Sequence, residues 1–183
     1  MKILAITVLL SAALATAFTQ DEPAQAKAEP QQHAWLLQMV GEWDVSSEAV
    51  IEPGTEAIRW NGSETVRSIG KLWIVAEGNM VGDGQSASTI MTLGYDPDLS
   101  SFVGSWVDSM HTTMWSYRGK LDSEQHILTL ETEGPSFNDP AKVSKYRDCL
   151  ELLDTNHKRM TSMVQAAGGT WRKYMTANYH RRK

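Results

Sequence analysis

The chain reads STIMTLGYDPDLSSFVGSWVDSMHTTMWSYRGK over residues 88–120. Residues 88–95, 101–108 and 112–120 within it are rich in β-branched and aromatic side chains, which favour extended backbone. The breaks between them are short, and the first contains Asp96-Pro97-Asp98, a turn sequence. Because so short a connection reverses the chain direction, these segments are predicted to be neighbouring antiparallel strands.

The same pattern continues on both sides of this stretch. Further strands are expected at residues 41–51, 57–69, 72–81, 127–133, 142–153, 159–166 and 171–180. About ten strands joined mostly by short turns predict an up-and-down meander. An open sheet of this kind would expose two edges, which closure into a barrel removes. We therefore expect an all-β, antiparallel up-and-down barrel, with a short amphipathic helix over residues 33–40 across one end.

Composition narrows the class of protein further. The chain has 183 residues, of which 42% are hydrophobic and 21% charged. These values are ordinary for a globular chain and fit a single domain over residues 33–183. Asp and Glu number 22 against 17 for Lys and Arg, which gives a net charge of −5. Because a general nucleic-acid binder needs a basic surface, no nucleic-acid partner is expected.

The N-terminus predicts export. An apolar stretch over residues 3–15 follows Met1 and Lys2, and Ala15-Thr16-Ala17 has the form of a signal-peptide cleavage site after Ala17. The stretch is shorter than a membrane span requires, so no stable membrane insertion is expected after cleavage. Residues 18–32 are largely polar and predict a flexible leader. The mature protein is therefore expected in the periplasm or outside the cell.

Several segments resemble a known group of proteins. Gly41-Glu42-Trp43, at the start of the first strand, is similar to the Gly-x-Trp of the calycin superfamily of lipocalins, fatty-acid-binding proteins and nitrobindins. Five further segments narrow the resemblance: GSETVRSIG at 62–70, LWIVAEG at 72–78, TLGYDP at 92–97, FVGSWVDSM at 102–110 and LTLETEGPSF at 128–137. Together, over residues 33–183, they resemble a bacterial family catalogued as domain of unknown function fifteen-seventy-nine. The resemblance implies a calycin-like barrel and transfers no catalytic or ligand-binding residue.

Strand alternation sorts the candidate ligand-binding side chains by face. Trp73 would share one face of its strand with Glu77, Trp106 would share one with Asp108, and Trp115 one with Tyr117. If these faces point inward, they line a largely apolar pocket with a few polar groups, to which Arg67 would add a charge.

The opposite orientation is open as well. A shift of one residue in register exchanges the two faces of a strand. The interior would then be filled by the alternate set, Leu72, Ile74, Ala76 and Met80, or Val103, Ser105 and Val107.

Asp108 and His111 are the candidate catalytic pair. They lie at a turn between strands, where a carboxylate and an imidazole could meet at the mouth of a barrel and perform general base chemistry. The alternative is that Asp108 stabilises the turn. No metal site is expected, because the other histidines lack ligand spacing.

Two further residues bear on cofactor binding and reactivity. A histidine on a late strand holds haem in nitrobindin-like barrels, but His180 is followed by Arg181, Arg182 and Lys183, which indicate a solvated tail. No cofactor is therefore expected. Cys149 is the only cysteine in the chain, so it forms no intramolecular disulfide and is either reactive or an inert strand residue.

The sequence favours a non-enzymatic, exported protein that binds a small apolar or aromatic ligand inside its barrel. Two alternatives stay open. One is an enzyme, a hydrolase or isomerase, that uses Asp108 and His111. The other is a protein-interaction module that binds through an exposed strand or a tryptophan patch.

Overall fold

The computed structural model describes residues 31–124 and 126–183. The predicted signal peptide (residues 1–17) lies outside these residues, as does all of the predicted leader except residues 31 and 32. The one helix of the described residues, α1 (Gln31–Leu37), begins two residues before the expected helix. No helix among the described residues is long and apolar enough to pass through a lipid bilayer.

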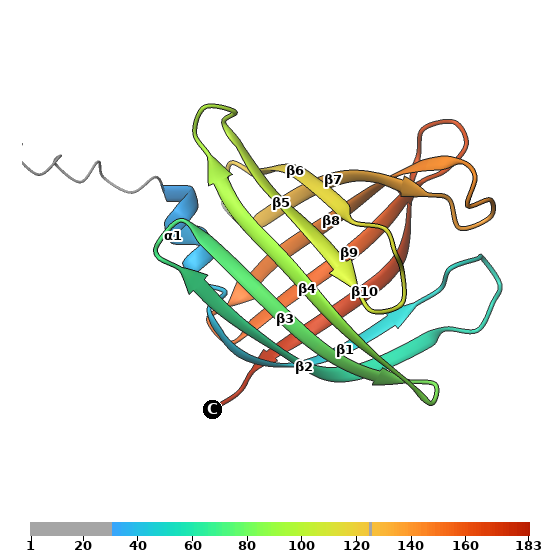
Figure 1. The fold of residues 1–183 in the computed structure, drawn as a ribbon, viewed down its shortest axis with the longest axis horizontal. Coiled ribbons are helices and arrows are strands. Elements are labelled where there is room, and N and C mark those ends of the chain that lie inside the picture. The colour runs from blue at the N-terminus through green and yellow to red at the C-terminus, as the bar shows by residue number, and fades with distance from the viewer. Residues whose placement is uncertain (1–30, 125) are drawn as a thin grey trace, which may run out of the picture.

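Ten antiparallel strands follow α1 and close into a barrel (Figure 1). They are β1 (Gly41–Ala49), β2 (Ile58–Ile69), β3 (Trp73–Gly82), β4 (Gln85–Asp96), β5 (Ser101–Asp108), β6 (Trp115–Leu121), β7 (Ile127–Pro135), β8 (Val143–Asp154), β9 (His157–Gln165) and β10 (Trp171–Arg181). Each strand pairs with its neighbours in sequence, and β1 also pairs with β10. The predicted all-β barrel with up-and-down order is confirmed.

Alternation along each strand divides the side chains between the interior and the solvent. In β7, Leu128 and Leu130 are fully buried, whereas the Glu131 and Glu133 side chains are more than half exposed. The alternating residues are thus apolar inside and charged outside, as a barrel with a packed interior requires.

The barrel is closed at the end where α1 lies (Figure 1). Trp35 of α1 contacts Phe102 edge to face, with ring centroids 6.1 Å apart, and His33 Nε2 lies 3.2 Å from the Tyr95 carbonyl oxygen. The Arg181 guanidinium donates to the carbonyl oxygens of Gln38 (2.8 Å) and Val40 (2.6 Å). These contacts fix the residues after α1 to the last strand, so side chains fill this end.

Trp43 is central to the closed end. It is 1% exposed, and its indole Nε1 donates to the Met39 carbonyl oxygen at 2.9 Å. The Arg181 guanidinium carbon lies 4.1 Å from the centroid of the Trp43 ring, and Lys158 Nζ lies 4.7 Å from it; both distances are typical of cation–π contacts. Trp43 of β1 thereby joins the residues after α1 to β9, through Lys158, and to β10, through Arg181.

The structure corrects the expected orientation of β3. Trp73 is 39% exposed and lies on the outer face, and the inner face carries Ile74, Ala76 and Met80 of the alternate set. Leu72, the fourth member of that set, precedes β3 and is 52% exposed. Trp73 covers Gly94 of β4, where a Cβ atom would lie 2.5 Å from the indole ring. The glycine leaves room for an indole on the outer face. Once Trp73 lies outside, alternation along β3 sets the face of every other side chain of the strand.

Glu77 and Arg67 are outside as well, so neither can serve as a charge within the barrel. Arg67 Nε lies 3.3 Å from Glu77 Oε1 across the β2–β3 pair, and both side chains are more than half exposed. A pair of this exposure contributes little to stability.

Candidate functional site

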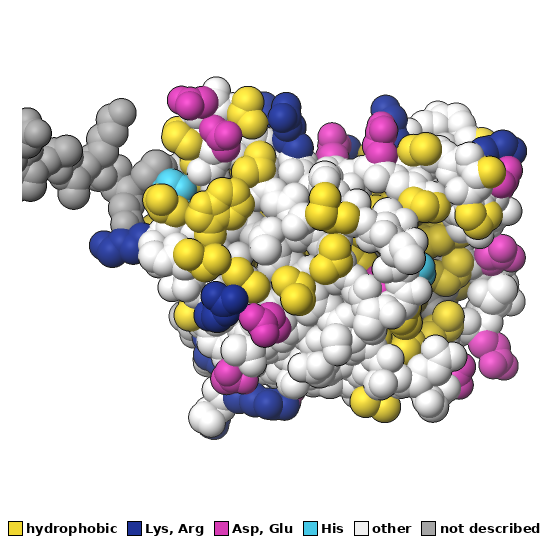
Figure 2. Space-filling model, viewed as in Figure 1, with side chains coloured by type: hydrophobic (Ala, Val, Ile, Leu, Met, Phe, Trp, Pro, Cys, Tyr) yellow, Lys and Arg dark blue, Asp and Glu magenta, His cyan; other side chains and the backbone are white. Residues whose placement is uncertain are grey.

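The barrel encloses a cavity toward the end opposite α1. Hydrophobic side chains are visible between the loops at that end (Figure 2). The cavity has two lobes of about 190 and 250 Å³. Both lobes are lined by Trp106, Met110, Met160 and Met175, so they lie side by side. A small molecule could enter from this end without moving α1.

The larger lobe, which we name the tyrosine lobe, lies against β5 to β10 and contains Tyr117, Tyr146 and Tyr174. Its rings contact one another edge to face: the Trp115 and Tyr146 centroids are 5.0 Å apart, and those of Phe137 and Tyr174 are 4.9 Å apart. Such a wall suits a flat apolar ligand.

Two local features of the backbone position these rings. The β9–β10 register shifts between Lys173 and Met175, so that Tyr174 and Met175 both line the tyrosine lobe. Gly134 of β7 leaves the space in which the Trp115 ring lies, because a Cβ atom there would overlap the ring.

A buried carboxyl group lies in the wall of the tyrosine lobe. Asp148 of β8 is 8% exposed, and its Oδ2 accepts a 2.5 Å hydrogen bond from the Tyr117 hydroxyl. Burial raises the pKa of Asp148 above its ordinary value, and side-chain hydrogen bonds from Ser162 and Tyr117 oppose part of that shift. Burial also raises the pKa values of Tyr117 and Tyr174, so both hydroxyls stay protonated at neutral pH.

Three buried polar atoms of this lobe have no hydrogen-bond partner among the described residues. They are Trp115 Nε1, Thr132 Oγ1 and Asp148 Oδ1. An unpaired buried polar atom costs about 1–3 kcal/mol, and native structures contain few of them. A site for an apolar ligand that carries a polar group would contain such a set of one donor, one hydroxyl and one acceptor.

The smaller lobe lies against β1 to β4 and β10, and we name it the methionine lobe. Met80, Met91, Met110, Met160 and Met175 contribute to it, and these flexible side chains can adapt to a ligand's shape. Glu64 lines it too, and its Oε1 lies 2.6 Å from Lys158 Nζ, with the two side chains 14% and 4% exposed. Burial lowers the pKa of Lys158, and the nearby Glu64 carboxylate opposes that shift.

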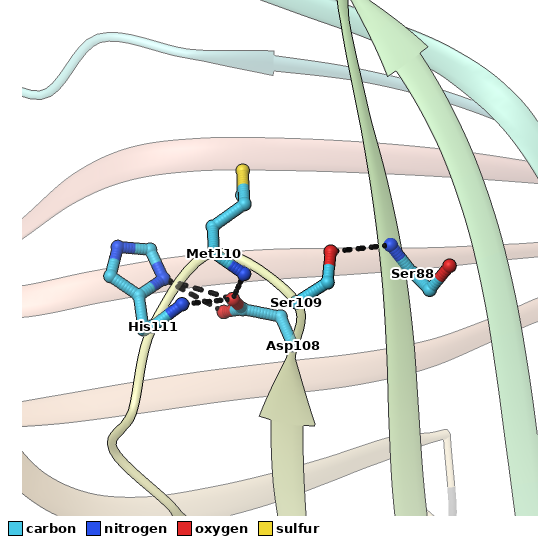
Figure 3. Close-up of polar contacts among 5 residues, drawn as sticks. All are labelled: Ser88, Asp108, Ser109, Met110 and His111. Atoms are coloured by element: carbon cyan, nitrogen blue, oxygen red, sulfur yellow. Dashed lines mark hydrogen bonds and ion pairs between the residues drawn. The ribbon is translucent and has the colours of Figure 1, made fainter.

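Asp108 and His111 do meet at the rim of the tyrosine lobe (Figure 3). Asp108 Oδ2 lies 2.9 Å from His111 Nδ1, while Oδ1 accepts the backbone N–H groups of Met110 (2.5 Å) and His111 (2.7 Å). The Asp108 side chain is buried and that of His111 is 62% exposed.

The same arrangement recurs at the other end of the barrel. Asp154 and His157 are also three residues apart, and Asp154 Oδ2 lies 2.7 Å from His157 Nδ1. The backbone N–H of Asn156 donates to Asp154 Oδ1. Because the motif appears at two distant turns, the contacts of Asp108 are those of a turn-stabilising residue. A catalytic role for Asp108 and His111 stays a prediction.

The cavity is thus lined by four of the seven candidate ligand-binding residues, and by His111 of the candidate catalytic pair. Trp106, Asp108, Trp115 and Tyr117 line the cavity, whereas Arg67, Trp73 and Glu77 lie outside it. Sequence reasoning missed Asp148, Tyr146 and Tyr174. Alternation places Asp148 on one face with Tyr146 and Leu150, so a signal for its burial was present.

Two other candidates lie away from the cavity lining. His180 is exposed, with its ring centroid 4.6 Å from that of His157. Cys149 is half-buried beside Thr129, and burial raises the pKa of its thiol, which keeps it protonated and poorly nucleophilic. The expectation that no cofactor is needed stays a prediction.

Replacement of Asp148 by Asn is expected to stabilise the protein at neutral pH. Because the folded pKa is raised, the folded protein holds a proton that the unfolded chain has lost above the ordinary value of 3.8. The free energy of unfolding therefore falls as pH rises from that value through the folded pKa, and stays low above it. The amide of the variant cannot ionise, so the variant should have the higher free energy of unfolding at pH 7.

Urea unfolding of both chains from pH 4 to pH 8 measures this effect. The difference between them should grow with pH, which separates Asp148 from every other titrating group. A difference that is constant with pH, or an Asn variant that is less stable at pH 7, would contradict the prediction.

Comparisons with known proteins agree with the barrel fold. The pattern of a family described as protein of unknown function (DUF1579) matches residues 28–181. No curated protein matches the chain. Two solved structures are similar. The S-type phycobiliprotein lyase CPES from Guillardia theta has a TM-score of 0.53 and 12% sequence identity, over 82% of this chain and 92% of that chain. Rv2717c from M. tuberculosis has a TM-score of 0.54 and 12% sequence identity, over 84% of this chain and 99% of that chain. At this identity they show a shared fold alone.

Proposed function

Because the chain belongs to the DUF1579 family, whose function is unknown, we propose a function from the cavity itself: the protein binds a small apolar or flat aromatic molecule inside its barrel and does not transform it. The observation that carries this proposal is the tyrosine lobe, an aromatic-walled space of about 250 Å³ with three unpaired polar atoms in its wall. Small-molecule sites combine an apolar lining with a few polar groups in this way.

The proposal includes export, since residues 1–17 have the form of a signal peptide. Native mass spectrometry of protein purified from its own host tests both parts. It should give a chain that begins at Phe18, together with a bound mass that is released on unfolding. A full-length chain would remove export from the proposal, and the absence of a bound mass would count against the ligand.

Substitution of Met160 by Trp should fill the cavity, because Met160 lines both lobes. We expect the dissociation constant for N-phenyl-1-naphthylamine, a neutral fluorescent probe, to rise at least about tenfold, or 1.4 kcal/mol. The matched control is Thr161→Trp, the next residue of β9, whose side chain lies on the opposite face. Equal affinities for wild type and Met160→Trp, or equal losses in the two variants, would remove the cavity as the binding site.

A further inference from the structure

The charged side chains that line the cavity are acidic apart from an exposed imidazole, and the buried Lys158 behind them is paired with Glu64. Among the described residues that line the two lobes, the ionisable side chains are those of Glu64, Asp108, His111, Asp148 and the tyrosines, and none is Lys or Arg. A carboxylate or phosphate ligand would therefore find no unpaired cation in the lining, and would lose its hydration without compensation.

The three carboxyl groups are not equivalent. Glu64 is paired with Lys158, and Asp108 already accepts the N–H groups of its turn and contacts His111. Asp148 alone has a buried oxygen, Oδ1, without a partner among the described residues. It is therefore the acceptor that a ligand group in the tyrosine lobe could use.

The aromatic rings around Asp148 favour the same kind of partner. Trp115, Tyr146 and Tyr174 line the lobe with it, and the faces of such rings attract cations. Burial raises the pKa of Asp148, which means that its charged form is costly while it has no counterion. A cation at Oδ1 would remove that cost, because the pair is then neutral.

The loops at the open end of the barrel are acidic, as the cavity lining is. These loops connect β1 to β2, β3 to β4, β5 to β6, β7 to β8 and β9 to β10. Their charged residues are Glu52, Glu56, Asp83, Asp139 and Lys142. Four acidic residues against one basic residue would raise the local concentration of a cationic ligand and repel an anionic one.

We propose that the ligand is an organic amine, a flat apolar body with one protonated nitrogen, and that the nitrogen pairs with Asp148 Oδ1 inside the tyrosine lobe. This inference rests on the proposed function and specifies its ligand class. Trp115 Nε1 and Thr132 Oγ1 then lie in the same wall to bond a second polar atom of the ligand.

Three probes that share one ring system test the charge preference. They are 2-naphthylmethylamine, 2-naphthylmethanol and 2-naphthylacetate, compared by isothermal titration calorimetry with the wild-type chain at pH 7. The amine is expected to bind at least about tenfold more tightly than the acetate, with the alcohol between them. Equal or tighter binding of the acetate overturns the amine proposal and leaves the proposed function standing. If none of the three binds, the proposed function fails too.

Two isosteric variants, each of which removes one negative charge, assign the preference to a residue. Asp148→Asn should reduce the ratio of amine to acetate affinity to about two or less. Glu77→Gln, on the outer face of β3, should leave the ratio unchanged. A ratio that Asp148→Asn does not alter would overturn the role of Asp148. Should that variant not fold, the wild-type ratio still decides the charge preference, since it needs no substitution.

Discussion

Replacement of Lys158 by Met is expected to lower the free energy of unfolding by about 3–5 kcal/mol, as is typical when one partner of a buried ion pair is removed. Lys158 is 4% exposed, and its Nζ lies 2.6 Å from Glu64 Oε1. The substitution leaves the Glu64 carboxylate facing the interior without a cation. It also removes the contacts of the ammonium with the rings of Trp43 and Tyr179.

Urea denaturation at pH 7 measures the loss. The matched control is Lys145→Met, because Lys145 Nζ lies 4.0 Å from Glu133 Oε1 and both side chains are more than 60% exposed. That variant should change stability by less than about 1 kcal/mol. Addition of Glu64→Leu to Lys158→Met should restore most of the loss, since no unpaired charge then remains. A Lys158→Met chain as stable as the control would contradict the prediction.

Substitution of Trp43 by Ala is the other change with a large expected effect, about 3–5 kcal/mol for a fully buried aromatic side chain. Trp43 fills the closed end of the barrel, where Arg181 and Lys158 lie against its ring. Its N–H also bonds to the Met39 carbonyl oxygen at 2.9 Å, which fixes the residues that follow α1.

Trp43→Phe separates these contributions. It keeps an aromatic ring and removes the N–H donor, so it should cost about 1 kcal/mol from the lost hydrogen bond and part of the packing. Hydrogen exchange should show faster exchange in α1 for the Ala variant than for the Phe variant. A loss below about 1.5 kcal/mol for Trp43→Ala would show that the closed end repacks without the indole.

The two large effects are not expected to add. Lys158 Nζ lies 4.7 Å from the Trp43 ring centroid, and groups in contact usually show coupling energies in double-mutant cycles. The sum of the single losses should exceed the loss in the double variant Trp43→Ala/Lys158→Met.

The candidate site was predictable strand by strand, to different degrees. For β5 and β6, the expected grouping of Trp106 with Asp108 and of Trp115 with Tyr117 agrees with the cavity lining. For β3 the grouping was right, but the sequence left two orientations open, because both faces of that strand carry apolar residues. Strand alternation alone cannot choose between two such faces.

Tyr174 and Asp148 illustrate the two kinds of residue that were missed. Tyr174 faces the cavity together with its neighbour Met175 because the register shifts there, and no alternation rule anticipates an irregularity of one residue. Asp148 was not among the expected site residues, because a carboxylate is usually exposed. Its burial depends on Tyr117, which donates to it from β6, 31 residues earlier in the chain.

The amino-acid sequence by itself determined the strands and their up-and-down order, because alternation and turn residues are local properties and short turns allow only antiparallel neighbours. Closure was predicted from the cost of two exposed edges, but the β1–β10 pairing that achieves it joins residues far apart in the chain. Only the tertiary structure decided which face of β3 points inward and that Asp148 lies buried in the cavity wall. Those outcomes depend on contacts between residues distant in the chain, such as Trp73 over Gly94 and Tyr117 with Asp148, and the energies of such contacts exist only once the barrel has closed.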